Sequence, residues 1–140
     1  MKSLRWFTVC AFALSLAPSL ALADDTSLAA SVQHRVQDGL LKPLAAFQSR
    51  FSRGRPPPHE SRVRVLSPTT TSDSAGRPFV AFAVDVNYGS QWQENDIVGC
   101  AYPKSGLLFV KIGDAYRPAS FLLGKVSDAV PGVCTAAPSS

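Results

Sequence analysis

The two cysteines Cys100 and Cys134 are the residues whose chemistry is clearest from the sequence. A metal or redox pair usually needs close CxxC-type spacing or histidine partners, and these two cysteines lie 34 residues apart. The third cysteine, Cys10, belongs to an N-terminal segment that we expect to be removed, so a single pairing remains. We predict a structural disulfide between Cys100 and Cys134, which loop-closure entropy credits with roughly 3.5 to 4 kcal/mol.

Other groups that could catalyse a reaction are few and scattered. The histidines His34 and His59 belong to no recognisable metal or nucleophile motif, and the chain has no glycine-rich phosphate loop. Glu94, Asp96 and Asp85 offer the oxygen ligands that calcium prefers, but their spacing matches no calcium loop. We therefore predict surface histidines, a solvated acidic turn, and no catalytic residue, metal or cofactor.

The stretch around Trp92 is the best candidate for contact with a partner. Trp92 stands among polar residues, between two predicted strands, where a loop tip would normally avoid a large aromatic ring. Tryptophan is enriched among interface hot spots, and binding residues concentrate on loops held by a rigid scaffold. The alternative is that Trp92 folds back and caps the core. The predicted partner-binding residues are Gln91, Trp92, Gln93 and Glu94.

Arginines form a second candidate site. Arg50 and four others follow one another where a predicted helix, a proline-rich connector and a predicted strand meet. Such a patch would attract phosphate or carboxylate groups, as on an anionic envelope polymer or lipid. The alternative is a solvated face, and without interleaved stacking aromatics we do not expect nucleic acid as a ligand. The predicted anion-binding residues are Arg53, Arg55, Arg62 and Arg64.

The N-terminus has the three parts of a cleavable secretory signal. Lys2 and Arg5 give a positive n-region, an apolar run follows from Trp6 to Leu16, and Ala21-Leu22-Ala23 supplies the small residues of a cleavage site. A spanning helix is the alternative, but a proline breaks the run, which is short for about 30 Å of hydrocarbon. We predict a signal peptide over residues 1–23, a periplasmic or secreted protein, and no transmembrane span in the mature chain.

Removal of that signal would leave 117 residues, enough for one domain. The formal net charge would fall from +4 to +2, because two of the basic residues belong to the signal. We predict a single domain over residues 24–134. Residues 135–140 are predicted to form a disordered tail, since they have nothing to bury.

A long helix is the first element that must position these residues. Apolar residues recur at steps of three or four between Ser27 and Phe51, which is helical periodicity. Pro43 lacks an amide hydrogen and restricts the residue before it, so we predict a kink or a break near Lys42. The apolar stripe consists of Leu28, Val32, Val36, Leu40, Leu44, Phe47 and Phe51.

About four strands follow the helix. Their predicted ranges are 62–65, 78–88, 96–102 and 107–112, the last two forming a hairpin. The outward face of the second strand is apolar at Ala81 and Ala83 and polar at Asp85, so we expect a helix over the alanines. Residues 118–123 fit either a short helix or a strand. The order predicts an α+β fold in which the helix packs on a small antiparallel sheet.

These features favour a small exported, non-catalytic module that binds another protein of the envelope or exterior, as an inhibitor, immunity factor or envelope accessory does. Attachment to an anionic surface through the arginines is the alternative. An enzyme of unfamiliar type is the third hypothesis.

Overall fold

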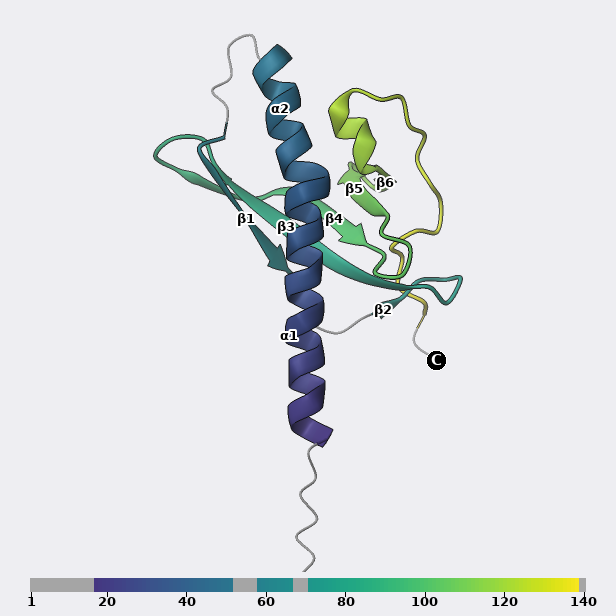
Figure 1. Cartoon of the computed structure of the whole chain (residues 1–140). Coiled ribbons are helices and arrows are strands. Elements are labelled where there is room, and N and C mark those ends of the chain that lie inside the picture. The colour runs from purple at the N-terminus through teal and green to yellow at the C-terminus, as the bar shows by residue number, and fades with distance from the viewer. Residues whose placement is uncertain (1–16, 52–57, 67–70, 139–140) are drawn as a thin grey trace, which may run out of the picture.

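A computed structural model of the chain describes residues 17–51, 58–66 and 71–138, with only the backbone for residues 17–26, 50 and 51. The predicted signal peptide lies largely outside the described residues. Within them, a long helical rod crosses one face of an antiparallel sheet (Figure 1). This arrangement confirms the predicted α+β fold.

The rod has three parts, α1 (Ala17–Val36), a π-helical turn η1 (Gln37–Leu41) and α2 (Lys42–Phe51). Pro43 accounts for the π turn, because a proline cannot donate an i→i−4 hydrogen bond and its ring crowds the carbonyl one turn earlier. The amide of Lys42 donates to the carbonyl of Gln37, five residues back. The helix thus takes up one additional residue in this turn and continues. The sequence had predicted a kink or a break at this point instead.

The π turn also keeps the apolar stripe on one face. Steps of four residues overshoot the 3.6-residue period of an α-helix, so such a stripe gradually rotates away from the sheet. A turn that takes up an additional residue reverses this rotation. As a result both Leu40 and Leu41 are buried at the turn.

The sheet has six strands, and among the described strands every neighbouring pair is antiparallel. Their spatial order is β1-β3-β4-β5-β6, with the short β2 pairing beside the start of β3. The strands β2 and β6 were not predicted from the sequence, because they are too short to show a period. The strands are β1 (Glu60–Val65), β2 (Thr71–Ser72), β3 (Pro78–Asn87), β4 (Trp92–Ala101), β5 (Leu108–Ile112) and β6 (Ala115–Pro118).

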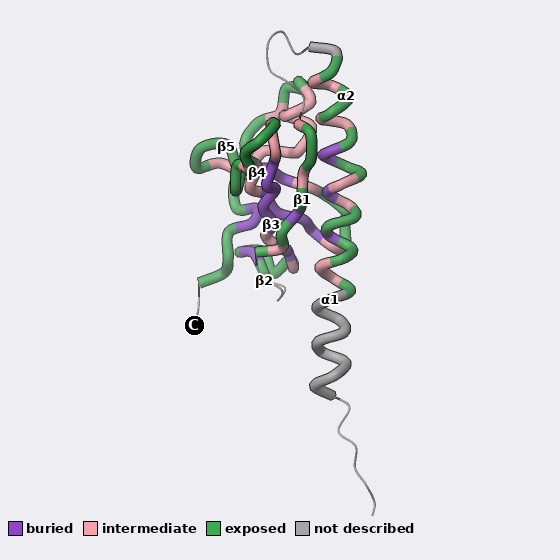
Figure 2. The backbone as a smooth tube through the Cα atoms, turned by 90° about the vertical axis from the view of Figure 1, so that its left-hand side faces the viewer, coloured by how far each residue is buried: buried purple, intermediate pink, exposed green. Residues whose placement is uncertain are grey.

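The face of the sheet under the helix carries the larger core (Figure 2). Alternate residues of β3 point into it, as the sequence predicted. Gly99 of β4 is required here because a Cβ at this position would clash with the backbone carbonyl oxygen of Phe109 and would lie 2.7 Å from Cζ of Phe82. The buried members of this core are Val32, Val36, Leu40, Leu41, Val63, Val80, Phe82, Val84, Val86, Ala101 and Val110.

The opposite face, which we call the outer face, is covered at one end only. We predicted a helix over this end, but the helix packs on the other face and the C-terminal segment lies here instead. The reason is the disulfide between Cys100 and Cys134, whose Cα atoms are 6.3 Å apart. This bridge confirms the predicted pairing and brings the tail against β4. The second core consists of Phe79, Cys100, Tyr102, Phe109, Val133 and Cys134.

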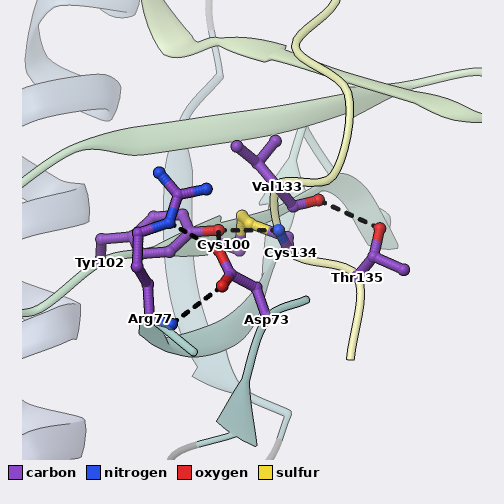
Figure 3. Close-up of a disulfide and its surroundings, with 7 residues drawn as sticks. All are labelled: Asp73, Arg77, Cys100, Tyr102, Val133, Cys134 and Thr135. Atoms are coloured by element: carbon purple, nitrogen blue, oxygen red, sulfur yellow. Dashed lines mark hydrogen bonds and ion pairs between the residues drawn. A yellow bond between two sulfur atoms is a disulfide. The ribbon is translucent and has the colours of Figure 1, made fainter. Parts of the chain in front are cut away.

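Asp73, Arg77, Tyr102 and the amide of Cys134 form a hydrogen-bond network beside the disulfide, which we call the Asp73 network (Figure 3). The carboxylate of Asp73 accepts hydrogen bonds from the amides of Ala75 and Arg77, from Nε of Arg77 and from the hydroxyl of Tyr102. The same hydroxyl accepts the amide of Cys134 over 2.8 Å. Burial alone would raise the pKa of Asp73, but these donors outweigh it and lower that pKa. Burial raises the pKa of Tyr102.

The last residues that the structure describes lie beside β2. Ala136 forms a bridge with Asp73, and the amide of Ala137 donates to the carbonyl of Ser72 over 3.0 Å. Before the tail, residues Ala119–Leu123 form the 3₁₀ helix η2, which ends at Gly124 with φ 79°. Of the two alternatives for residues 118–123, the helix is therefore the correct one. Among the described residues, no helix is both long and apolar enough to cross a membrane.

Candidate functional site

Trp92 lies at the first position of β4 and not at the tip of a loop. Its ring is half-buried and belongs to neither hydrophobic core. The guanidinium carbon of Arg62, on the neighbouring end of β1, lies 4.4 Å from the centre of the ring. Gln91 and Glu94, close to it in the chain, are exposed, and Gln93 is exposed on the opposite face of the strand. The structure thus packs the indole under an arginine on the outer face, not against the core.

A β-bulge explains how β4 reaches Trp92. Between the pairs Val84–Ile97 and Val86–Gln93, three residues of β4, from 94 to 96, stand opposite the single residue Asp85 of β3. Asn95 in the middle of the bulge has φ 56°, a left-handed conformation that asparagine adopts more readily than most residues. Bulges of this kind bend a strand and redirect its side chains. The polar stretch that resembled a loop is therefore an irregular strand.

Asp85 organises the bulge and the two arginines. Its carboxylate is fully buried and accepts hydrogen bonds from Arg64 through Nε at 2.7 Å and Nη2 at 2.9 Å. Nε of Arg62 donates to it at 3.0 Å and the amide of Asn95 at 3.1 Å. These donors, Arg64 foremost, hold the pKa of Asp85 far below its usual value, although burial acts in the opposite direction. A buried carboxylate is tolerated here because its oxygens are paired.

The two arginines are anchored at one side and open at the other. Arg62 and Arg64 keep 51% and 44% of their side chains exposed. Nη2 of Arg64 also donates to Oδ1 of Asn95 over 3.0 Å. The nearby carboxylates of Asp85 and Glu94 both act to raise the pKa of Arg64. The positive charges of Arg62 and Arg64 therefore lie close to the negative charges of Asp85 and Glu94.

The structure joins two predicted sites into one. We call the group of Arg62, Arg64, Gln91, Trp92 and Glu94 the Trp92 surface. The predicted partner-binding residue Gln93 does not belong to it, because Gln93 pairs with Val86 and points to the helix-covered face. The sequence placed the arginines and the tryptophan in separate sites, because nothing in their spacing showed that β1 and β4 flank the same end of β3. The predicted anion-binding residues Arg53 and Arg55 lie outside the described residues.

His34 and Asp96 lie apart from this surface, whereas Asp85 lies directly beneath its two arginines. His34 pairs with Asp38 on the exposed side of the rod, at 3.2 Å. Asp96 accepts the hydroxyl of Tyr88 over 2.8 Å, and the carboxylate of Asp85 is engaged by arginines. Over residues 17–51, 58–66 and 71–138, no group of three or more His, Cys, Asp or Glu is arranged to hold a metal ion.

Sequence reasoning missed the roles of Asp85 and Asn95. A signal for the first was present: Asp85 interrupts an apolar strand on the face where Arg62 and Arg64 of the neighbouring strand also point. Comparisons of the chain with protein families, curated proteins and solved structures found no match. The function must therefore be inferred from the residues of the chain itself.

Proposed function

We propose that this protein is an exported, non-catalytic module that binds another protein through the Trp92 surface. The observation that carries the proposal is the stack of Arg62 on Trp92, held from beneath by the buried Asp85. Tryptophan and arginine are the residue types most enriched among interface hot spots.

Preorganisation supports this assignment. An exposed arginine normally loses much side-chain entropy when a partner immobilises it. Here Asp85 already fixes Arg62 and Arg64 in the free protein, and the two-point contact to Arg64 defines the plane of its guanidinium. A partner would therefore meet a shaped surface at a reduced entropic cost.

The charge balance favours a protein partner over a polyanion. Arg62 and Arg64 would attract an anionic polymer or lipid if their charges were free, but Asp85 and Glu94 stand beside them. The remaining attraction for a dense array of phosphates is weak. An aromatic ring flanked by hydrogen-bonding side chains suits a mixed protein surface.

Export is part of the proposal and has two supports. The first is the N-terminal pattern of basic, apolar and small residues. The second is the bridge between Cys100 and Cys134, since structural disulfides persist in oxidising compartments. The non-catalytic character is supported by Asp73 and Asp85, the two buried carboxylates among the described residues, both of which serve structural ion pairs.

A crosslinked capture from the native envelope or secreted fraction tests the proposal. Wild type and Trp92→Ala are compared at low and at high salt, and bound proteins are read by mass spectrometry. The expected result is a discrete protein partner that resists salt and is lost with Trp92→Ala. Capture that ignores Trp92 and disappears at high salt would contradict the proposal and favour electrostatic attachment, because phosphate contacts weaken steeply with ionic strength.

A further inference from the structure

A groove of about 710 Å³ lies on the helix-covered side of the sheet, away from the Trp92 surface. Its walls come from η1 and α2, from the start of β1, from β3 and β4, and from η2. This volume falls within the range of small-molecule sites, roughly 300 to 1,000 Å³. The apolar wall residues that matter here are Leu41, Leu44, Phe47, Val86, Ile97 and Leu122.

The π turn shapes one side of this groove. Gln37 and Leu41, the first and last residues of η1, both border it. Single π turns inside α-helices occur frequently at functional sites. The turn follows from Pro43, and its consequence is that the apolar stripe of α2 continues along the groove.

The polar groups of the groove are of several kinds, and they include Lys42, His59 and the two carboxylates of Glu60 and Asp96. In the part of the chain that the structure describes, Oε1 of Gln48 is the one buried side-chain oxygen or nitrogen without a hydrogen-bond partner. Native proteins leave few such atoms, so this acceptor in the groove wall calls for an explanation. A ligand that carries a hydrogen-bond donor would pair with this oxygen of Gln48.

Asp96 gives the groove its charge. Its carboxylate accepts the hydroxyl of Tyr88, and among the described residues no lysine or arginine forms an ion pair with it. Lys42 also borders the groove, but its ammonium is paired with Asp38. Among the described residues, the groove therefore presents a carboxylate without an ion-pair partner beside an apolar wall.

We infer that this groove binds a small amphipathic amine, with its apolar body along α2 and its protonated amino group at Asp96. An ammonium carries three donors and no acceptor, which matches a carboxylate and a carbonyl acceptor in the same groove. A carboxylate ligand would meet Asp96 as a like charge. The inference does not depend on the Trp92 surface, which faces the other side of the sheet.

Isothermal titration calorimetry tests the inference. Octylamine is titrated into protein purified after expression of the full sequence. Octanoate and octanol serve as head-group controls at about pH 8, where the amine is protonated. The expected result is saturable one-site binding of octylamine. Octanoate should bind at least about tenfold more weakly.

Two variants of α2 locate the site. Ala45 and Ala46 are adjacent and exposed, but only Ala45 borders the groove. Ala45→Trp should fill the groove and weaken octylamine binding at least about tenfold, whereas Ala46→Trp should leave it within about twofold. Circular dichroism and thermal melts confirm that each variant is folded.

Two further variants test the polar groups without filling the groove. Asp96→Asn keeps an acceptor for Tyr88 and should abolish the preference for octylamine over octanoate. Gln48→Met keeps the side-chain shape without its acceptor and should weaken octylamine binding severalfold. The inference is overturned if octylamine gives no saturable heat, if octanoate binds as tightly, or if Ala45→Trp binds octylamine like wild type.

Discussion

The guanidinium carbon of Arg62 lies 4.4 Å from the centre of the Trp92 ring, while Nε of the same arginine donates to the buried carboxylate of Asp85 over 3.0 Å. Arg62 thus connects an aromatic ring at the surface to an acid in the interior. A cation–π contact at an exposed site contributes only about 0.5 to 1 kcal/mol. Its importance here is that Asp85 determines where Arg62, and through it Trp92, can lie.

Replacing Asp85 with asparagine should therefore loosen the Trp92 surface and lower the melting temperature by several degrees. The amide carries no charge and accepts at one oxygen only, so Arg62 and Arg64 lose their shared partner. In a Trp6→Phe background Trp92 is the sole tryptophan, and its quenching by acrylamide should increase. Asp114→Asn, at an exposed turn, is the matched control. Unchanged quenching and melting in Asp85→Asn would refute this role.

Stability should fall in acid because of Asp85 and Asp73. Hydrogen bonds hold the pKa of both carboxyls below the ordinary value in the folded protein, so the unfolded chain takes up protons first as the pH falls. The stabilisation is complete above about pH 5 and is lost progressively below about pH 4. Denaturant unfolding at about pH 7 and about pH 3 measures the loss. The double variant Asp73→Asn with Asp85→Asn should show a flatter pH dependence, and an equal slope would contradict the account.

Periodicity was sufficient to predict most of the fold. The apolar stripe of the rod and the alternation of β3 each specify one buried face, and the single cysteine pair specified the disulfide. The π turn was not predictable in kind, because Pro43 excludes a regular α turn but does not select between a kink and a π turn. β2 and β6 are short strands whose existence depends on their neighbours in the sheet.

The candidate site was predictable only in part. Trp92 and the arginines were found by residue type, but their contact depends on the register of β1, β3 and β4 and on the bulge opposite Asp85. No local pattern encodes that register. From the sequence, Asp85 was considered as a calcium ligand. Its partners Arg62 and Arg64 are evident only from the pairing of β1 with β3.

Tyr102→Phe should destabilise the protein by about 1 to 3 kcal/mol, since it leaves the buried Asp73 carboxylate and the Cys134 amide without their shared hydroxyl. Urea unfolding measures the change. Tyr116→Phe, at a half-buried tyrosine of β6, is the matched control and should have a smaller effect. Equal effects of the two substitutions would show that the Asp73 network contributes nothing to the free energy of unfolding.

Reduction of the disulfide should lower the melting temperature by several degrees, because loop closure contributes roughly 3.5 to 4 kcal/mol. The pair Cys100→Ser and Cys134→Ser should reproduce the effect and make the protein insensitive to reductant. Thiol titration of the native protein provides the check. Two freely reactive thiols at these positions would contradict the bridge.

Photocrosslinking from Glu94 tests the proposed function most directly, since this exposed residue lies close to Trp92 in the chain and acts on the charge of Arg64. A photoreactive amino acid is placed at Glu94 or, as a control, at Val126, which is 98% exposed. The account predicts an adduct with one discrete protein of the native export fraction from position 94, absent from position 126 and lost when Trp92→Ala is added. No adduct from position 94, or the same adduct from both positions, would contradict the assignment of the Trp92 surface as a protein-binding site.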